Sequence, residues 1–275
     1  MAARWTYRRI RRIPRAIGRR MQRVVEPPTG KRALRRRLVA EGAAPHPQPP
    51  GRAWTAWVNR ALREESELEE ALAELKTCGL APHEDRPKNW DLLIALGLIL
   101  ESTGRDAAVL DMGATQYSRL LPWLFLYGYR SLRGIDLVYT EPIKAGPIRY
   151  ERMDLTATTF PDRSFDAITS LSVIEHGVDP DRYLREAGRL LRPGGLLITS
   201  TDYWCGPVDT GGQTAYGVPI KIFQPDEIRD LVHRAAAHGL EPTGPLDLTC
   251  GERAVTWARF GLHYTFVNVV LRRAA

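Results

Sequence analysis

The segment AAVLDMGATQYSRLLPWLFLYGYRSLRGIDL, residues 107–137, decides the fold. It opens with a short apolar run at 107–111, which has the length of a buried strand. This run ends at Asp111, and Gly113 follows after Met112. A carboxylate and a glycine after a buried run predict that the strand stops there in a tight turn.

A helix and a second strand follow this turn. Leucines at helical spacing predict a helix over 117–127, and Pro122 requires either a kink or a later start. The next apolar run, 131–135, ends at Asp136. The segment therefore predicts a strand–helix–strand unit with one acid at the tip of each strand.

The residues at the two strand tips favour a ligand that contains ribose. A glycine at the end of the first strand allows a ligand to approach the backbone closely, and the following helix presents N–H groups. The carboxylate of Asp136 can accept two hydrogen bonds from a ribose diol.

Five sections of the chain, in order, carry a family resemblance: VLDMG, GIDL, MDLT, SFDAITSLSVIEH and LLRPGGLLITS. Over roughly residues 85–272 the chain resembles the class I S-adenosylmethionine-dependent methyltransferases, in particular the branch that acts on small molecules. The resemblance implies an α/β fold of the Rossmann-like, doubly wound type. It has seven mostly parallel strands and an antiparallel last strand, and here it follows an N-terminal helical extension.

The resemblance also implies S-adenosylmethionine as the cofactor and assigns residues to it. Asp136 is placed for the ribose, Asp154 for the adenine amino group with Leu155 beside the ring, and Asp111 for the amino end. The full set of implied cofactor-binding residues is Asp111, Gly113, Ala114, Thr115, Asp136, Leu137, Asp154, Leu155 and Ser170.

The turn after the first strand departs from the family's D-x-G-x-G-x-G pattern. Only Gly113 remains, while Thr115 and Tyr117 occupy the later glycine positions. Either the turn tolerates these side chains or its backbone differs. This departure motivates an alternative, a catalytically silent Rossmann-like protein that binds nucleic acid or a protein partner through its basic arm.

The segment SLSVIEHG, 170–177, and the tip of the fifth strand supply the candidate catalytic residues, His176 and Asp202. An imidazole can take a proton from a hydroxyl group at neutral pH, although His176 could equally hold the loop. A position that carries a carboxylate in metal-using relatives is Ser172 here, so no metal site is expected. No sequence typical of base methylation is present. We expect O-methylation of a small metabolite or glycan, and N-methylation stays open.

Positive charge is concentrated in an arm at the start of the chain. The net charge is +7, but residues 1–37 contain 14 Lys and Arg against one Glu, which leaves 25 basic and 31 acidic residues elsewhere. Apolar residues recur among these arginines, which favours either a solvated tail or a basic amphipathic helix on an anionic membrane. Nucleic acid is an unlikely partner, because the motifs for methylating bases are absent.

We expect three parts of the chain: a basic arm and Pro-rich linker at 1–50, a helical lid at 51–84 and a methyltransferase domain at 85–275. A helix over 54–75 would form the lid. The three cysteines are far apart, which predicts neither a zinc site nor a disulfide framework. A cytoplasmic location is expected, with peripheral attachment to the membrane as an alternative.

Overall fold

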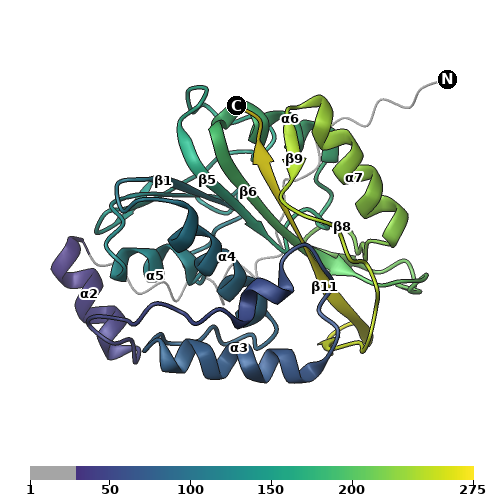
Figure 1. The fold of residues 1–275 in the computed structure, drawn as a ribbon, viewed down its shortest axis with the longest axis horizontal. Coiled ribbons are helices and arrows are strands. Elements are labelled where there is room, and N and C mark those ends of the chain that lie inside the picture. The colour runs from purple at the N-terminus through teal and green to yellow at the C-terminus, as the bar shows by residue number, and fades with distance from the viewer. Residues whose placement is uncertain (1–28) are drawn as a thin grey trace.

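The computed structural model describes residues 29–275, which form a layered α/β structure around a nine-stranded sheet (Figure 1). The strand order is β10-β11-β6-β5-β1-β2-β4-β3, and β9 pairs with β11. The strands are β1 (Ala108–Met112), β2 (Ser131–Ile135), β3 (Ile143–Ala145), β4 (Ile148–Glu151), β5 (Phe165–Leu171), β6 (Leu191–Tyr203), β9 (Leu240–Pro242), β10 (Val255–Trp257) and β11 (Leu262–Arg273).

Five neighbouring strands, β4, β2, β1, β5 and β6, run parallel, while β11 is antiparallel to β6. This arrangement confirms the predicted fold. The seven expected strands are present, and β3 and β10 add two short strands at the edges. Because the carboxyl ends of parallel strands share one edge, the acids near the ends of β1, β2 and β4 are brought to the same side of the molecule.

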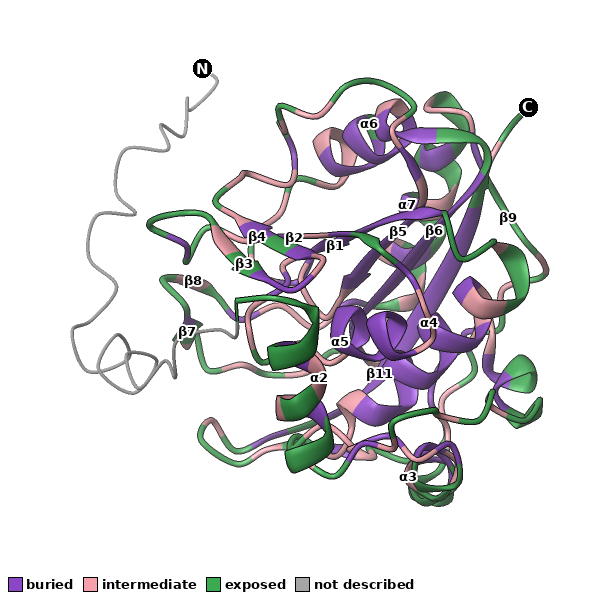
Figure 2. Ribbon diagram, turned by 90° about the vertical axis from the view of Figure 1, so that its left-hand side faces the viewer, coloured by how far each residue is buried: buried purple, intermediate pink, exposed green. Residues whose placement is uncertain are grey.

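Helices cover both faces of the sheet (Figure 1). One face carries α4 (Lys88–Ser102) and α5 (Leu120–Leu126), with α3 (Glu65–Thr77) outside them, and the other carries α6 (Pro180–Leu190) and α7 (Pro225–Ala237). Each side has its own buried apolar cluster. Figure 2 shows the strands and the inner helices buried and the outer helices exposed along one side.

Local signals explain where three of the helices begin. The side chain of Asp179 caps α6 by accepting from the Arg182 N–H, and α7 begins with a capping box of Gln224 and Glu227. Helix α5 starts only at Leu120, which is the later start that Pro122 allowed.

The predicted helix over 54–75 is wrong in its first half. A short 3₁₀ helix, η1 (Ala53–Trp57), is followed by extended chain, and the α-helix begins only at Glu65. The cause is Asn59, which adopts a φ of 57° and accepts a hydrogen bond from the Val270 N–H while its own N–H donates to Asn268. These buried hydrogen bonds attach the segment around Asn59 to β11. A helix over this segment would prevent them from forming.

The part of the predicted arm and linker that the structure describes packs on the domain. Helix α2 (Lys31–Ala40) buries Leu34 and Leu38, and Glu41 forms ion pairs with Arg37 and Arg119. The expected helix within residues 1–28 lies outside the described residues. The three predicted domain boundaries stay predictions.

The expectation of no disulfide is wrong. Cys205, just after β6, is bonded to Cys250, and Cys78 is a buried free thiol. The two bonded cysteines are 45 residues apart in sequence, so their spacing could not indicate that two loops meet here. The hydroxyl of Tyr203 also donates to the Leu248 carbonyl, which joins the same two loops.

None of the helices in the described part of the chain combines the length and the apolar character that crossing a membrane would require.

Two very short strands, β7 (Thr214–Ala215) and β8 (Val218–Pro219), form a separate hairpin in the long segment after β6. Its turn consists of Tyr216 and Gly217, both with positive φ. The turn brings an aromatic side chain close to the segment after β5, where the ring of Tyr216 lies 4.9 Å from that of His176.

Candidate functional site

The turn after β1 depends on Gly113. Its φ is +79°, and a Cβ atom there would overlap the side chain of Val173. The N–H groups of Gly113 and Ala114 both donate to the carbonyl of Ile135, at 2.8 and 3.0 Å. The turn is therefore fixed to the end of β2, which holds the tips of the two strands together.

Thr115 and Tyr117 fit this turn. Neither is among the residues with a positive φ, so the turn does not need glycine at these positions. The Thr115 hydroxyl accepts from the Tyr117 N–H at 3.3 Å, and its carbonyl accepts from the Ser118 N–H. The altered turn is thus a regular structure that leaves Tyr117 about half exposed.

Asp111 lies inside the sheet edge rather than on its surface. It is buried, and its Oδ1 accepts from the Thr169 hydroxyl on β5 at 2.7 Å. Burial raises the pKa of this carboxyl to about 7. Asp111 therefore braces β1 against β5.

Asp136 and the residues after it form an open surface. The Asp136 carboxylate is half-buried and accepts from the Val138 N–H at 2.8 Å. Burial raises its pKa, whereas the N–H groups of Val138 and Leu137 act in the opposite direction. Leu137 and Val138 are among the few large apolar side chains that are exposed in the described residues. An exposed apolar pair beside a carboxylate suits a ligand with both a diol and a flat ring.

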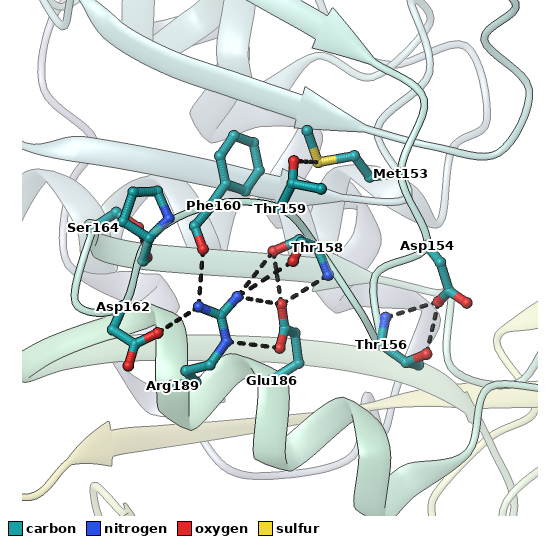
Figure 3. Close-up of polar contacts among 11 residues, drawn as sticks. Met153, Asp154, Thr156, Thr158, Thr159, Phe160, Asp162, Ser164, Glu186 and Arg189 are labelled. Atoms are coloured by element: carbon teal, nitrogen blue, oxygen red, sulfur yellow. Dashed lines mark hydrogen bonds and ion pairs between the residues drawn. The ribbon is translucent and has the colours of Figure 1, made fainter.

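Asp154 lies where the chain leaves β4, and its Oδ1 accepts from both the N–H and the hydroxyl of Thr156 (Figure 3). Both bonds end on one oxygen. The second oxygen stays available for a donor such as an adenine amino group. Leu155 is half-buried next to it.

The loop after Asp154 is fastened to α6 by an ion-pair cluster (Figure 3). Arg189 contacts Glu186 and Asp162 and donates to the Phe160 carbonyl, while Glu186 also accepts from Thr158. Hydrogen bonding to Glu186 raises the pKa of Arg189. Burial opposes ionisation of Glu186, but bonds from Arg189 and Thr158 outweigh it and lower its pKa. This clamp fixes residues 158–162, a few positions after Asp154, to α6, and it was not foreseen from the sequence.

Three buried carboxyl groups gather near the ends of β5 and β6. Asp91 on α4 accepts a hydrogen bond from the Ser200 hydroxyl at 2.6 Å. Glu175 accepts one from the Thr201 hydroxyl at 3.0 Å. The third acid, Asp202, follows Thr201 in β6. All three are at most 4% exposed. Asp91 Oδ1 and Glu175 Oε1 have no hydrogen-bond partner among residues 29–275. A buried carboxyl oxygen of this kind needs either a hydrogen-bond donor beside it or a proton on the carboxyl group.

Burial makes these acids hold protons more tightly. It raises the pKa of Asp91 to about 6, and the pKa of Glu175 also rises. The pKa of Asp202 is raised well above its ordinary value, first by burial and then by the charge of Glu175. Lys88, at the start of α4, opposes all three shifts because its charge favours the ionised forms.

His176 lies in the same region but titrates in the opposite direction. Burial, and then the charge of Lys88, lowers its pKa to about 4, so the imidazole is neutral at physiological pH.

Ser170, a predicted cofactor residue, is completely buried within β5, and its hydroxyl has no hydrogen-bond partner among the described residues. Ala114 is also buried, and its carbonyl accepts from the Tyr139 hydroxyl at 2.8 Å. The contacts of the remaining assigned residues with a cofactor stay predictions.

Sequence reasoning missed Asp91 and Glu175 as members of this cluster. Asp91 stands in the first turn of α4, where acids are common, so its position in the sequence gave no sign that it would be buried. No group of three or more side chains suited to a metal ion occurs in the described part of the chain.

Comparison with known proteins identifies the central region. Residues 110–199 match a model described as a methyltransferase domain. An uncharacterized methyltransferase from Mycobacterium sp. (strain JLS) is 36% identical over 116 residues, 39% of this chain and 43% of that protein. A ubiquinone biosynthesis O-methyltransferase from Cereibacter sphaeroides (strain KD131) is 26% identical over 190 residues, 64% of this chain and 70% of that protein.

A solved structure extends the similarity of the fold. Geranyl diphosphate C-methyltransferase from Streptomyces coelicolor A3(2) has a TM-score of 0.51 and 19% identity, over 89% of this chain and 98% of that one. The chain spans less than half of the length of the mycobacterial relative.

Proposed function

We propose, on the premise that the chain is a class I S-adenosylmethionine-dependent methyltransferase, that it methylates a hydroxyl group of a small metabolite or glycan. The observation that carries the proposal is the group of buried carboxyls at the ends of β5 and β6, next to the edge with Asp136. Carboxyl oxygens without partners suit an acceptor that donates hydrogen bonds through hydroxyl groups.

The residues at the sheet edge fit the cofactor. Gly113 leaves no room for a side chain, Asp136 and Asp154 offer carboxylate oxygens, and exposed Leu137 offers an apolar surface. We assign the ribose to Asp136 and the adenine to Asp154 and Leu155. The bound cofactor supplies an activated methyl group on a sulfonium.

The protein's own task is then to orient the acceptor, exclude water and take up a proton. The hairpin with Tyr216 at its tip lies over His176 and would cover the acceptor. Asp202 takes up the hydroxyl proton in this proposal, because it lies at the end of β6 beside the candidate acceptor site, where burial and the charge of Glu175 raise its pKa. His176 contributes shape and a neutral hydrogen-bonding surface.

The similarity to a ubiquinone biosynthesis O-methyltransferase supports a hydroxyl acceptor, although it is distant. N-methylation uses the same scaffold. The test is transfer of a labelled methyl group from S-adenosylmethionine to two matched panels, one of sugars and phenols and one of primary amines. We expect labelled products in the first panel only. Labelling confined to the amines would contradict the hydroxyl assignment.

We also propose that the basic arm binds an anionic membrane surface. Helix α2 supports an electrostatic attachment, because Leu34 and Leu38 are buried against the domain while Lys31, Arg32 and Arg36 are exposed. Sedimentation of the full chain with phosphatidylglycerol vesicles, but not with phosphatidylcholine vesicles, is the expected result. Equal sedimentation with both would contradict it.

A further inference from the structure

The disulfide between Cys205 and Cys250 lies at the surface, just after the end of β6. Cys205 is exposed and Cys250 is half-buried. A thiol reduces a disulfide by bringing its thiolate to one of the two sulfurs, so access decides whether a folded protein can be reduced. The exposed position of Cys205 allows this attack without unfolding of the domain.

The bond attaches a segment that has few other attachments. No backbone hydrogen bond joins residues 205–212 to any part of the described chain beyond Gln213. The side chain of Val208 packs half-buried against the core. A segment without backbone hydrogen bonds to its surroundings opens locally at low cost, so the covalent bond is its strongest attachment.

The loop that carries Cys250 is held firmly. The N–H of Asp247 donates to the carbonyl of Asn59 at 2.8 Å, and the Oε2 of Glu252 accepts from the N–H of Glu65 at 2.9 Å. This loop is therefore fixed to the segment before α3. The disulfide ties a weakly attached segment to a firmly attached one, so its reduction should release only the former.

Two contacts beside the bond do not depend on it. The hydroxyl of Tyr203 donates to the carbonyl of Leu248 at 2.7 Å, and the guanidinium of Arg253 lies 4.4 Å from the centre of the Trp204 ring. These contacts keep the two loops adjacent after reduction. The same bond can then form again, which makes the change reversible.

We propose that the Cys205–Cys250 bond is a redox-sensitive anchor, which holds residues 205–212 when oxidised and releases them when a dithiol reduces it. These residues lead into the β7–β8 hairpin, whose Tyr216 ring lies 4.9 Å from that of His176. The inference rests on the proposed function, in which this hairpin covers the acceptor. Reduction should therefore weaken acceptor binding.

The cofactor edge should not respond to reduction. The turn at Gly113 and Ala114 is held by its own hydrogen bonds to the carbonyl of Ile135. Affinity for S-adenosylhomocysteine is thus expected to be equal in the oxidised and reduced forms.

The redox step is an exchange with an external dithiol. One thiolate of the dithiol attacks a sulfur of the protein disulfide, which forms a mixed disulfide and releases the other cysteine as a thiolate. The second thiol of the dithiol then displaces the bound cysteine. The protein gains two electrons and two protons as two thiols, and the dithiol is oxidised to a disulfide.

Thiol counting in the folded, full chain tests whether the bond can be reached. We expect N-ethylmaleimide to modify no cysteine before treatment with dithiothreitol and two after it, because Cys78 is buried. A folded chain in which dithiothreitol exposes no thiol would overturn the proposal.

Limited proteolysis with subtilisin tests the release. We expect cleavage within residues 205–212 to become about tenfold faster in the reduced, alkylated chain, while the rest of the domain stays intact. Equal cleavage in both forms would overturn the anchor. Cleavage throughout the reduced domain would also overturn it, because the bond would then hold the whole fold.

Two serine substitutions sharpen the test. Cys205→Ser should show the fast cleavage without any reductant, whereas the matched control Cys78→Ser should keep the response to dithiothreitol. If Cys205→Ser does not fold, the reduced form of the unsubstituted chain still decides.

This inference and the proposed function can fail separately, because neither thiol counting nor proteolysis needs an acceptor. Release on reduction in a chain that labels only amines would support the anchor and refute the hydroxyl acceptor. For a labelled hydroxyl acceptor, we expect a several-fold higher KM in the reduced form. An equal KM in both forms would overturn the control of acceptor binding.

Discussion

The hydroxyl of Ser200 donates to Oδ2 of Asp91 at 2.6 Å, which joins the first turn of α4 to the end of β6. These residues are 109 positions apart in sequence. The bond places a helix that precedes the first strand directly against the carboxyl edge of the sheet. The acceptor side of the site is therefore built from α4 as well as from the loops, and Lys88 reaches the buried acids from the same helix.

Gly113→Ala should reduce both stability and cofactor binding. The new Cβ would overlap Val173 in a turn with φ +79°, so we expect a loss of about 1–3 kcal/mol in the free energy of unfolding. Gly194→Ala is a matched control, because Gly194 also has φ +79° but has no atom within 4 Å of the added Cβ. Urea unfolding and titration with S-adenosylhomocysteine measure both effects. Equal losses in the two variants would show that steric overlap at Gly113 is unimportant.

Asp136→Ala should weaken cofactor binding without unfolding the protein. A charge-assisted hydrogen bond to a ribose hydroxyl is worth about 1.5–3 kcal/mol, and Asp136 is half-buried at an open edge. Calorimetry with S-adenosylhomocysteine measures the change, and Asp209→Ala in the loop after β6 serves as a control. Unchanged affinity in Asp136→Ala would remove this residue from the cofactor site.

Arg189→Ala tests the clamp on the loop after Asp154. The substitution leaves Glu186 largely buried without its cation, so we expect a loss of about 1–3 kcal/mol in stability. Cofactor affinity should also fall, because the loop that carries Asp154 is released. Arg185→Ala, on the same helix, removes only an exposed ion pair with Asp181 and should change little. Full affinity in Arg189→Ala would contradict a role for the clamp in binding.

The disulfide makes a prediction about thiol chemistry. The denatured, unreduced protein should show one reactive thiol, that of Cys78, and reduction should expose three. Reduction should lower the melting temperature, because the bond closes a loop of 45 residues and such bonds typically contribute about 2–4 kcal/mol. Three reactive thiols before reduction would show that Cys205 and Cys250 are not joined.

The sequence predicted the parallel core of the fold well, because each buried strand is a short apolar run that ends at a polar residue. The runs over 131–135 and 165–171 coincide with β2 and β5. The segment before the domain was less predictable. Trp54 and Trp57 have helical spacing, yet the buried amide of Asn59 bonds to β11 more than 200 positions away. No local pattern contains that information.

The candidate site, like the fold, could be predicted from the sequence only in part. The strand pattern predicted that Asp111, Asp136 and Asp154 lie at or just after the ends of three strands, and the structure places them there. The extent to which each acid is buried could not be predicted, because it depends on the segments that pack over the strand ends. Asp111 is enclosed and bonded to Thr169, whereas Asp136 stays half-exposed. The low proton affinity of His176 likewise comes from burial and from Lys88, which is 88 residues earlier in the chain.

Calorimetric titration of S-adenosylhomocysteine into the full chain tests the central claim most directly. The claim is that the sheet edge formed by Gly113, Asp136 and Asp154 is a working cofactor site despite Thr115 and Tyr117. We expect saturable binding at one site per chain with micromolar affinity. A folded chain that shows no binding would contradict the claim and favour a silent Rossmann-like protein whose arm binds a partner.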